Sequence, residues 1–326
     1  MTGSSPSSAI NAFIRRVDLI RRPYLPAVAV TILLFVLNGY LQPKTLRPVA
    51  IVADISTFLP LILLAVGQTY VVLAADIDLS VGSIISLVNV VAVSVIVALG
   101  GSQAAIFGGI AAGLLVGVVC GAFNGFCVAV LRFQPIVATF ASGIIFAGIA
   151  LWILPQAGLP TPDAYWETYG DNLAGVPFVL WILTAMAAAV ALIARLVFSR
   201  SLLAVGGNIQ SAYQSGLAVP RLRISAYILC GLFAALSALC LTGDTGSGDP
   251  LLGAKMTLGS VAAVVLGGTA LSGGRGNPLG SVFGAVILGL IGSVVFFAGV
   301  PFEYQNLVQG LIVLAALAGG VTVARR

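Results

Sequence analysis

The sequence predicts an all-α polytopic transmembrane bundle of about ten spans with both chain ends on the cytoplasmic side. First, 60% of the 326 residues are hydrophobic and only 8% are charged, whereas soluble domains carry about 25% charged residues. Second, apolar runs long enough to cross a bilayer as a helix, about 20 residues, follow one another along the chain. Third, runs such as 179–198 and 278–297 are apolar on every face, which excludes the alternating pattern of a membrane β-barrel.

The ten spans are expected at residues 24–42, 54–75, 80–99, 104–131, 135–154, 176–198, 222–243, 256–271, 278–298 and 304–323. The first run follows four arginines but is too long for a usual signal-peptide core, so we interpret it as a retained span. The eighth run is short and the fourth is long, so one of the two is expected to be broken or tilted. The chain therefore divides into a cytoplasmic tail over residues 1–23 and one transmembrane domain over residues 24–326.

The distribution of basic residues sets the orientation, because Lys and Arg concentrate in cytoplasmic loops. With the N-terminus inside, only Lys44, Arg47 and Lys255 fall on the outer side. The other twelve basic residues fall on the cytoplasmic side: Arg15, Arg16, Arg21, Arg22, Arg132, Arg195, Arg200, Arg221, Arg223, Arg275, Arg325 and Arg326. This asymmetry predicts that both termini are cytoplasmic. Seven of the ten acidic residues then face outward, either as ordinary solvated loop ends or as a face for a soluble partner.

Cysteine and histidine usage narrows the chemistry. All four cysteines, Cys120, Cys127, Cys230 and Cys240, fall inside apolar runs and are interpreted as small buried side chains rather than as a disulfide framework or metal site. Histidine is absent, which removes the commonest metal ligand and proton relay. The sequence therefore disfavours a metalloenzyme and a proton-driven carrier, and we expect no cofactor and no metal on this chain.

The first candidate functional segment holds two carboxylates between two fully apolar spans. Asp76 and Asp78 are followed by Ser80, Gly82 and Ser83. A charge at the bilayer centre costs about 2.5 to 3.5 kcal/mol on the insertion scale, so the pair is expected at an interface or in a wet cavity. Two interpretations remain open: Asp78 or Ser80 caps the following helix, or the five residues line a translocation path.

The second candidate is the glycine-rich stretch 266–278. Gly268 and Gly273 have the separation of a phosphate-binding loop, but Gly274 and Arg275 follow where that motif requires Lys and Ser or Thr. No strand is predicted before it either, so the phosphate-binding interpretation fails. We expect a tight turn between helices, with its backbone groups satisfied by protein or water.

Two regions of the chain repeat the same pattern. Val71-Val72-Leu73 precedes Val81-Gly82-Ser83, and Val264-Val265-Leu266 precedes Leu279-Gly280-Ser281. In the predicted topology the leading span of each pair runs from the outer to the inner side. The pattern therefore predicts a parallel internal repeat, although it rests on few small and apolar residues.

The third candidate is the inner loop 199–223. Asn208 can cap a two-turn helix, and Gly216 can end it in the left-handed conformation. Ile209, Ala212 and Tyr213 then share one face. Because so short a helix is marginal alone, this face should pack either against the chain's own spans or against a cytoplasmic partner.

Together these segments resemble the ribose-type sugar permeases of the ABC importers. The similarity lies in Asp-Leu-Ser-Val-Gly-Ser at 78–83, in 135–151, in the Gly-Gly-Asn…Ser-Gly segment at 206–216 and in 264–276, in the family's order, and covers roughly residues 50–320. The resemblance implies a permease dimer, with a second copy or a paralogue, in the bacterial inner membrane and its lipid. It also implies a periplasmic or extracellular solute-binding protein and a separate cytoplasmic ATPase; no nucleic acid is involved.

In such a permease the short inner helix is the coupling helix that meets the ATPase. The residues to which the resemblance assigns this role are Asn208, Ile209, Ala212, Tyr213, Ser215 and Gly216. This sequence departs from the family there, with Ile209 and Gln210 where acidic residues are frequent and Tyr213 where Arg is common. The departure favours apolar over ionic docking.

The expected function is therefore the translocation of a monosaccharide or similar small polar solute, with ATP hydrolysed on another chain. The alternative is an ion-coupled secondary transporter, which usually displays an ionisable group inside the membrane. A membrane enzyme would need converging nucleophile, base or metal ligands, and the sequence offers none. The solute itself stays open among pentoses, hexoses, polyols and autoinducers.

Overall fold

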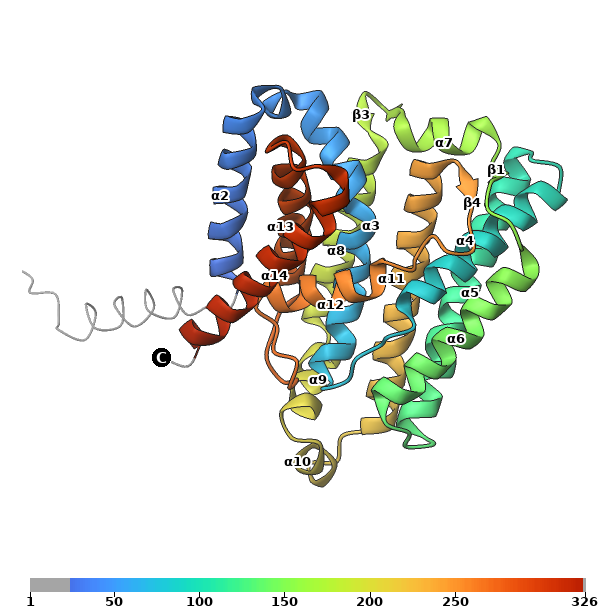
Figure 1. The fold of residues 1–326 in the computed structure, drawn as a ribbon. Coiled ribbons are helices and arrows are strands. Elements are labelled where there is room, and N and C mark those ends of the chain that lie inside the picture. Colours follow the sequence, from blue (N-terminus) through green and yellow to red (C-terminus); the bar gives the residue numbers. More distant parts are fainter. Residues whose placement is uncertain (1–23, 325–326) are drawn as a thin grey trace, which may run out of the picture.

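The computed structural model describes residues 24–324, with side chains described to residue 314, and it is almost entirely helical (Figure 1). The helices are α2 (Leu25–Leu41), η1 (Pro43–Leu46), α3 (Pro48–Leu73), α4 (Val81–Ala98), α5 (Gln103–Ala129), α6 (Pro135–Ile153), α7 (Asp163–Gly170), α8 (Phe178–Arg195), α9 (Val197–Gly207), α10 (Ile209–Gln214), α11 (Val219–Thr245), α12 (Met256–Leu266), α13 (Pro278–Phe297) and α14 (Phe302–Ala324). Four two-residue strands complete it: β1 (Leu159–Pro160), β2 (Asn172–Leu173), β3 (Val176–Pro177) and β4 (Ser247–Gly248). The predicted all-α membrane class is confirmed.

Each of the ten predicted spans corresponds to one helix, but not all are long enough to cross alone. In the described part of the chain, seven helices have the length and composition of a span: α3, α4, α5, α6, α8, α11 and α13. Helix α2 has 17 residues and α12 only 11. At 1.5 Å per residue, α12 reaches about 16 Å, roughly half of the hydrocarbon core. The eighth predicted span, 256–271, is therefore a half-helix, and the number of crossings stays a prediction.

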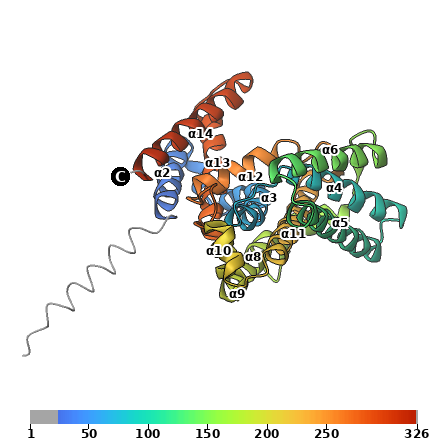
Figure 2. The ribbon, with the colours of Figure 1, turned by 90° about the horizontal axis from the view of Figure 1, so that it is seen from below.

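Helix α11 lies at the centre of the bundle, against α5, α3 and α4 (Figures 1 and 2). Its contact with α5 depends on glycines spaced by four residues. A Cβ added at Gly117 would lie 2.5 Å from the carbonyl oxygen of Gly231, and one added at Gly121 would collide with the carbonyl of Tyr227. Small residues at this spacing let two membrane helices approach closely, since van der Waals packing rather than the hydrophobic effect holds them together in lipid.

The outer loop between α6 and α8 closes over one end of the bundle. Strand β1 pairs with β4, so that Leu159 lies opposite Gly248. Helix α7 is fastened by two buried tyrosines: the hydroxyl of Tyr165 donates to the carbonyl of Leu239, and that of Tyr169 donates to the carbonyl of Ser56. The loop thereby holds the segment that leads from α11 to α12.

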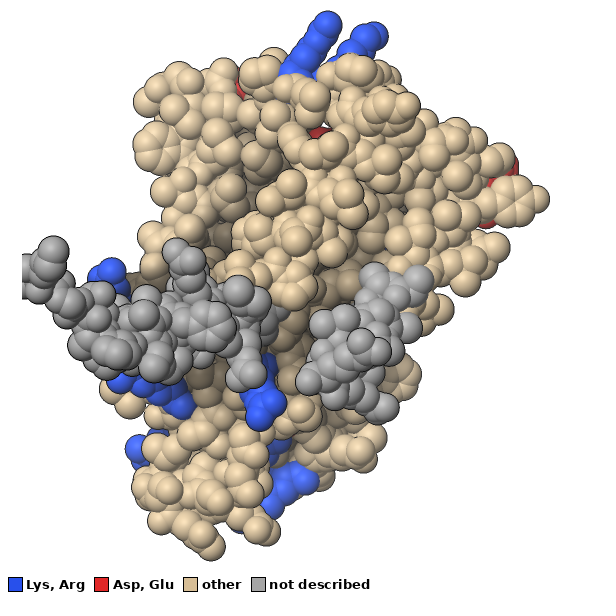
Figure 3. Space-filling view, turned by 90° about the vertical axis from the view of Figure 1, so that its left-hand side faces the viewer, with Lys and Arg blue, Asp and Glu red and all other residues tan. Residues whose placement is uncertain are grey.

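Basic side chains mark the opposite end. Six of the nine basic residues between 24 and 324 belong to the end of the molecule that carries α10: Arg132, Arg195, Arg200, Arg221, Arg223 and Arg275. Lys44 and Arg47 lie in and beside η1 at the other end. In Figure 3 two basic side chains project from the upper edge, and the other visible ones lie lower on that face. This fits the predicted orientation, although the predicted cytoplasmic tail 1–23 and residues 325–326 lie outside the described residues.

We expect Gly121→Ala to destabilise the protein by about 1 to 3 kcal/mol, because the new methyl group must displace the backbone of α11. Gly148→Ala is the matched control, since a Cβ there meets nothing within 4 Å on the same kind of apolar helix. Thermal unfolding of the two purified variants in detergent compares them. Equal midpoints would show that the α5–α11 contact is looser than described.

Candidate functional site

A non-helical segment, residues 74–80, joins the inner end of α3 to the start of α4. Helix α3 ends with Ala75 in the left-handed region (φ 65°) and with the amide of Asp76 donating to the carbonyl of Val71. Helix α12 ends in the same way, with Gly268 at φ 85° and the amide of Thr269 donating to the carbonyl of Val264. Both are Schellman-type helix ends. The matching ends support the predicted internal repeat, at the positions where the sequence pattern placed it.

The glycine-rich loop 267–277 packs against this segment as a tight turn, as predicted. The amide of Gly274 donates to the carbonyl of Leu73 at 3.1 Å, which places the end of the loop on the end of α3. Gly206 of α9 lies against the same carbonyl so closely that a Cβ there would collide with it. Three chain segments therefore meet through backbone atoms directly next to α10.

Asp78 is fully buried at the centre of a hydrogen-bond network. Its Oδ1 accepts from the amide of Ser80 at 2.8 Å and from the Ser80 hydroxyl at 2.6 Å. Asn124 of α5 donates to Ser80 Oγ at 2.7 Å, and Gln68 of α3 donates to the carbonyl of Asp78. Burying a carboxylate is costly unless such bonds satisfy it. The network therefore fixes the segment between α3, α4 and α5.

Asp76 is paired with Arg223 near the inner end of α11. Arg223 Nε donates to Asp76 Oδ2 at 2.9 Å and Nη2 to Oδ1 at 2.7 Å, with side chains 15% and 4% exposed. A bidentate pair of this kind is stronger and more directional than a neutral hydrogen bond. It connects segment 74–80 to the helix that begins directly after the α10 loop.

Helices α4 and α12 begin side by side and satisfy each other's backbone. Thr257 Oγ1 of α12 accepts from the amide of Gly82, and Ser86 Oγ of α4 accepts from the amide of Gly253. Farther out, Asn89 Nδ2 donates to the carbonyl of Ser247 while its Oδ1 accepts from the amide of Asp249. These bonds let the non-helical residues 246–255 lie among the spans, where water cannot satisfy them.

The predicted outer position of Lys255 is wrong. Lys255 directly precedes α12, and its neighbours Gly253 and Thr257 bond to the first two turns of α4. Ser86 lies twelve residues before Ala98, the outer end of α4, or about 18 Å along the helix. Figure 1 likewise shows α12 about midway between the two ends of the bundle. Lys255 therefore lies inside the membrane layer, because residues 246–255 descend from the outer end of α11 before α12 begins.

Of the five residues predicted to line a path, only Ser83 is partly exposed. Asp76, Asp78, Ser80 and Gly82 are buried, and their path role stays a prediction. The capping alternative holds only in part: Asp78 accepts from the amide of Ser80, one residue before α4, whereas the Ser80 hydroxyl accepts from no amide of that helix.

Helix α10 forms as predicted at both ends. Asn208 Oδ1 accepts from the amide of Ser211 at 2.9 Å, and Gly216 has a φ of 79°. The proposed docking face is divided, however. Ala212 is buried against Val205 and Val219. By contrast, Ile209 and Tyr213 are 40% and 49% exposed. Ala212 thus packs on the chain's own helices. An exposed surface of α10 remains, formed by Ile209, Tyr213 and Ser215.

Sequence reasoning missed Asn124, Thr257 and Arg223 as partners of these segments. The available signal was their polarity: Asn124 and Thr257 each stand within an apolar run, and polar groups within spans pair with one another. Which partner each would find depends on helix packing. No group of three metal-binding side chains occurs among the residues that the structure describes, and the expectation of no cofactor stays a prediction.

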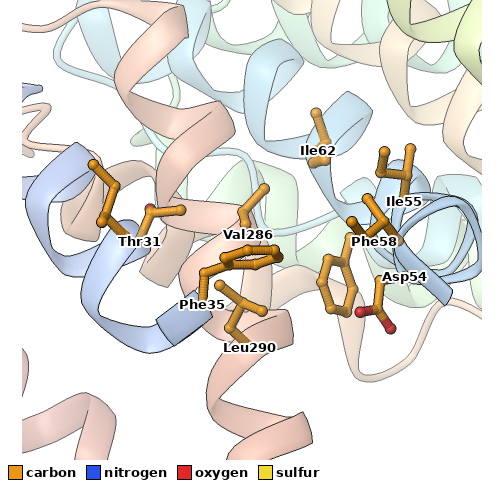
Figure 4. A pocket seen from close by; sticks show the side chains of 10 residues that line it. Thr31, Phe35, Asp54, Ile55, Phe58, Ile62, Val286 and Leu290 are labelled. Atoms are coloured by element: carbon orange, nitrogen blue, oxygen red, sulfur yellow. The ribbon is translucent and has the colours of Figure 1, made fainter. Parts of the chain in front are cut away.

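A cavity of about 340 Å³ lies elsewhere, between α2, α3 and α13. Its lining is apolar apart from Thr31 and Asp54, and Figure 4 shows Phe35, Phe58 and Leu290 around it. A site for a sugar needs several convergent polar groups. This cavity is therefore not a candidate sugar site.

Comparison with known proteins identifies the chain's relatives. Residues 50–317 match the family described as the permease component of the branched-chain amino acid transport system. The ribose import permease protein RbsC of Escherichia coli K12 is 34% identical over 264 residues, covering 78% of this chain and 80% of the relative. RbsC of Bacillus subtilis 168 is 32% identical, covering 90% of each chain. The autoinducer 2 import system permease protein LsrC of E. coli K12/DH10B is 35% identical, covering 90% and 85%.

The Asp76–Arg223 pair gives a testable energetic signature. Asp76→Asn or Arg223→Gln alone leaves one buried charge unpaired and should cost about 3 to 5 kcal/mol. The double variant Asp76→Asn with Arg223→Gln removes both charges and should recover much of the loss. Thermal unfolding in detergent measures all three. Losses that simply add in the double variant would show that the pair contributes no coupling.

Proposed function

We propose that this chain carries a monosaccharide or similar small polar solute as the permease subunit of an ABC importer. The chain belongs to the family of branched-chain amino acid transport system permease components. It is a multi-pass membrane transporter subunit rather than an enzyme. The observation that carries the choice of solute is the similarity to import permeases for ribose and autoinducer 2 over most of the chain. Their solutes suggest the chemical class.

The proposed assembly contains two permease copies, a cytoplasmic ATPase and a soluble solute-binding protein in the bacterial inner membrane. A separate ATPase is consistent with the glycine-rich loop, whose sequence lacks the Lys and Ser or Thr of a phosphate-binding loop. A second copy is supported by Leu251, which is 60% exposed within the non-helical residues 246–255. Non-helical backbone at this depth requires cover by protein or water rather than by lipid.

The inner contacts offer a route from the ATPase to the solute path. Helix α10 follows α9, whose Gly206 touches the carbonyl of Leu73. Leu73 also accepts from Gly274 and directly precedes segment 74–80, which Asp76 connects to Arg223. A displacement of α10 would therefore be transmitted through packed backbone to both loops of the repeat. This supports the predicted coupling role of α10.

Reconstituted vesicles test the function as a whole. The purified chain should neither bind nor hydrolyse ATP, and uptake of a radiolabelled monosaccharide should require ATP, the ATPase and the binding protein together. Uptake driven by a proton or sodium gradient with neither partner present would instead favour the alternative, an ion-coupled secondary transporter.

A second test concerns the exposed apolar pair on α10. Ile209→Ser with Tyr213→Ser should weaken ATPase capture by roughly tenfold or more, since buried apolar anchors carry most of an interface's binding energy. Gln214→Ser, an exposed polar position on the same helix, is the matched control. Capture and uptake are measured at equal permease levels. The buried Ala212 is left unchanged, because a larger side chain there would disrupt the chain's own packing. Normal ATPase capture by the Ile209→Ser, Tyr213→Ser variant would exclude this surface as the docking site.

A further inference from the structure

Lys255 is a charged side chain inside the membrane layer without an ion-pair partner among the residues that the structure describes. Its side chain is exposed, and over residues 24–324 it forms no ion pair; Asp76 and Arg223 supply the described salt bridge. A lysine at the bilayer centre costs about 2.5 to 3.5 kcal/mol when lipid surrounds it. Ionisable groups at this depth therefore face a water-filled cavity or a partner.

The surroundings of Lys255 favour water over lipid. It ends the non-helical segment 246–255, and the helix after it exposes Leu258, three residues farther on, at 75%. Residues three apart on a helix share a face, so Lys255 and Leu258 open toward the same side. Irregular backbone at membrane depth occurs where it is buried in protein or lines a water-filled cavity. The exposed ammonium of Lys255 on such backbone indicates a water-filled cavity.

We propose that Lys255 lines the solute path and makes it selective by charge, rejecting cationic solutes while admitting neutral or anionic oxygen-rich ones. This rests on the proposed transport function. The ammonium group carries three hydrogen-bond donors and no acceptor, which suits the hydroxyl, carboxylate or phosphate oxygens of such solutes. A fixed positive charge in a narrow path repels a second cation, as basic side chains do in other membrane pores. A protonated amino sugar would therefore be excluded.

The test uses cysteine accessibility in the complete transporter, with Cys120, Cys127, Cys230 and Cys240 replaced by Ala. A reporter Leu258→Cys is treated in membranes with two water-soluble methanethiosulfonates, one anionic and one cationic. It should react, and the anionic reagent should be favoured by about tenfold after correction for reaction with a free thiol, as expected for one nearby charge in water. Leu115→Cys is the control, because Leu115 is 64% exposed midway along α5 and should be protected by lipid.

Lys255 is then substituted in the protein that carries the Leu258→Cys reporter. Lys255→Arg should keep the preference for the anionic reagent, and Lys255→Met should remove most of it. Failure of Leu258→Cys to react with either reagent in any transport state, or an unchanged preference in Lys255→Met, would overturn the inference. Uptake is measured separately on the reporter protein with Lys255 intact. A reactive, charge-selective reporter without ATP-dependent uptake would count against the proposed function and leave the charge-selective cavity standing.

Discussion

The arrangement of this protein depends on one constraint: non-helical backbone inside a membrane must find its hydrogen-bond partners within the protein. Two stretches are subject to it, segment 74–80 and residues 246–255. They meet where α4 and α12 begin. Thr257 of α12 accepts from the amide of Gly82 at the start of α4, and Ser86 of α4 accepts from the amide of Gly253 within residues 246–255. Removing either hydroxyl would leave a buried amide unpaired, so the starts of both helices are fixed together.

The same constraint explains why the polar residues are distributed as they are. Asp78, Ser80 and Asn124 are buried in one network, and Asp76 is buried against Arg223. These groups position the segment and are not open to a solute in this conformation. Near the starts of α4 and α12, Lys255 is exposed and Ser83 and Thr257 are partly exposed. A path role for the buried carboxylates would need the network to open, which makes it a property of another transport state.

The sequence predicted the features that depend on local chemistry. Hydropathy located ten helices, because apolar length is a direct consequence of bilayer thickness. The ends of α10 followed from Asn208 and Gly216, since capping uses neighbouring residues. The position of Lys255 was missed because hydropathy cannot distinguish a loop outside the membrane from a non-helical segment that descends into it. The sequence left open whether Ala212 packs on its own chain or on a partner, because its burial depends on Val205 and Val219 from neighbouring segments.

The two halves of the internal repeat end their leading helices in the same way but continue into different loops. The shared helix end follows Val71 in the first half and Val264 in the second. The first half continues into two buried carboxylates that bind Arg223 and Ser80. The second continues into a glycine-rich turn that packs on Leu73 and lies beside Gly206. Glycine permits backbone contact without a side chain in the way, and Asp76 fixes the first loop to α11 through Arg223. The second loop is thus held against α3 and α9 by backbone contacts, while an ion pair holds the first loop against the central helix.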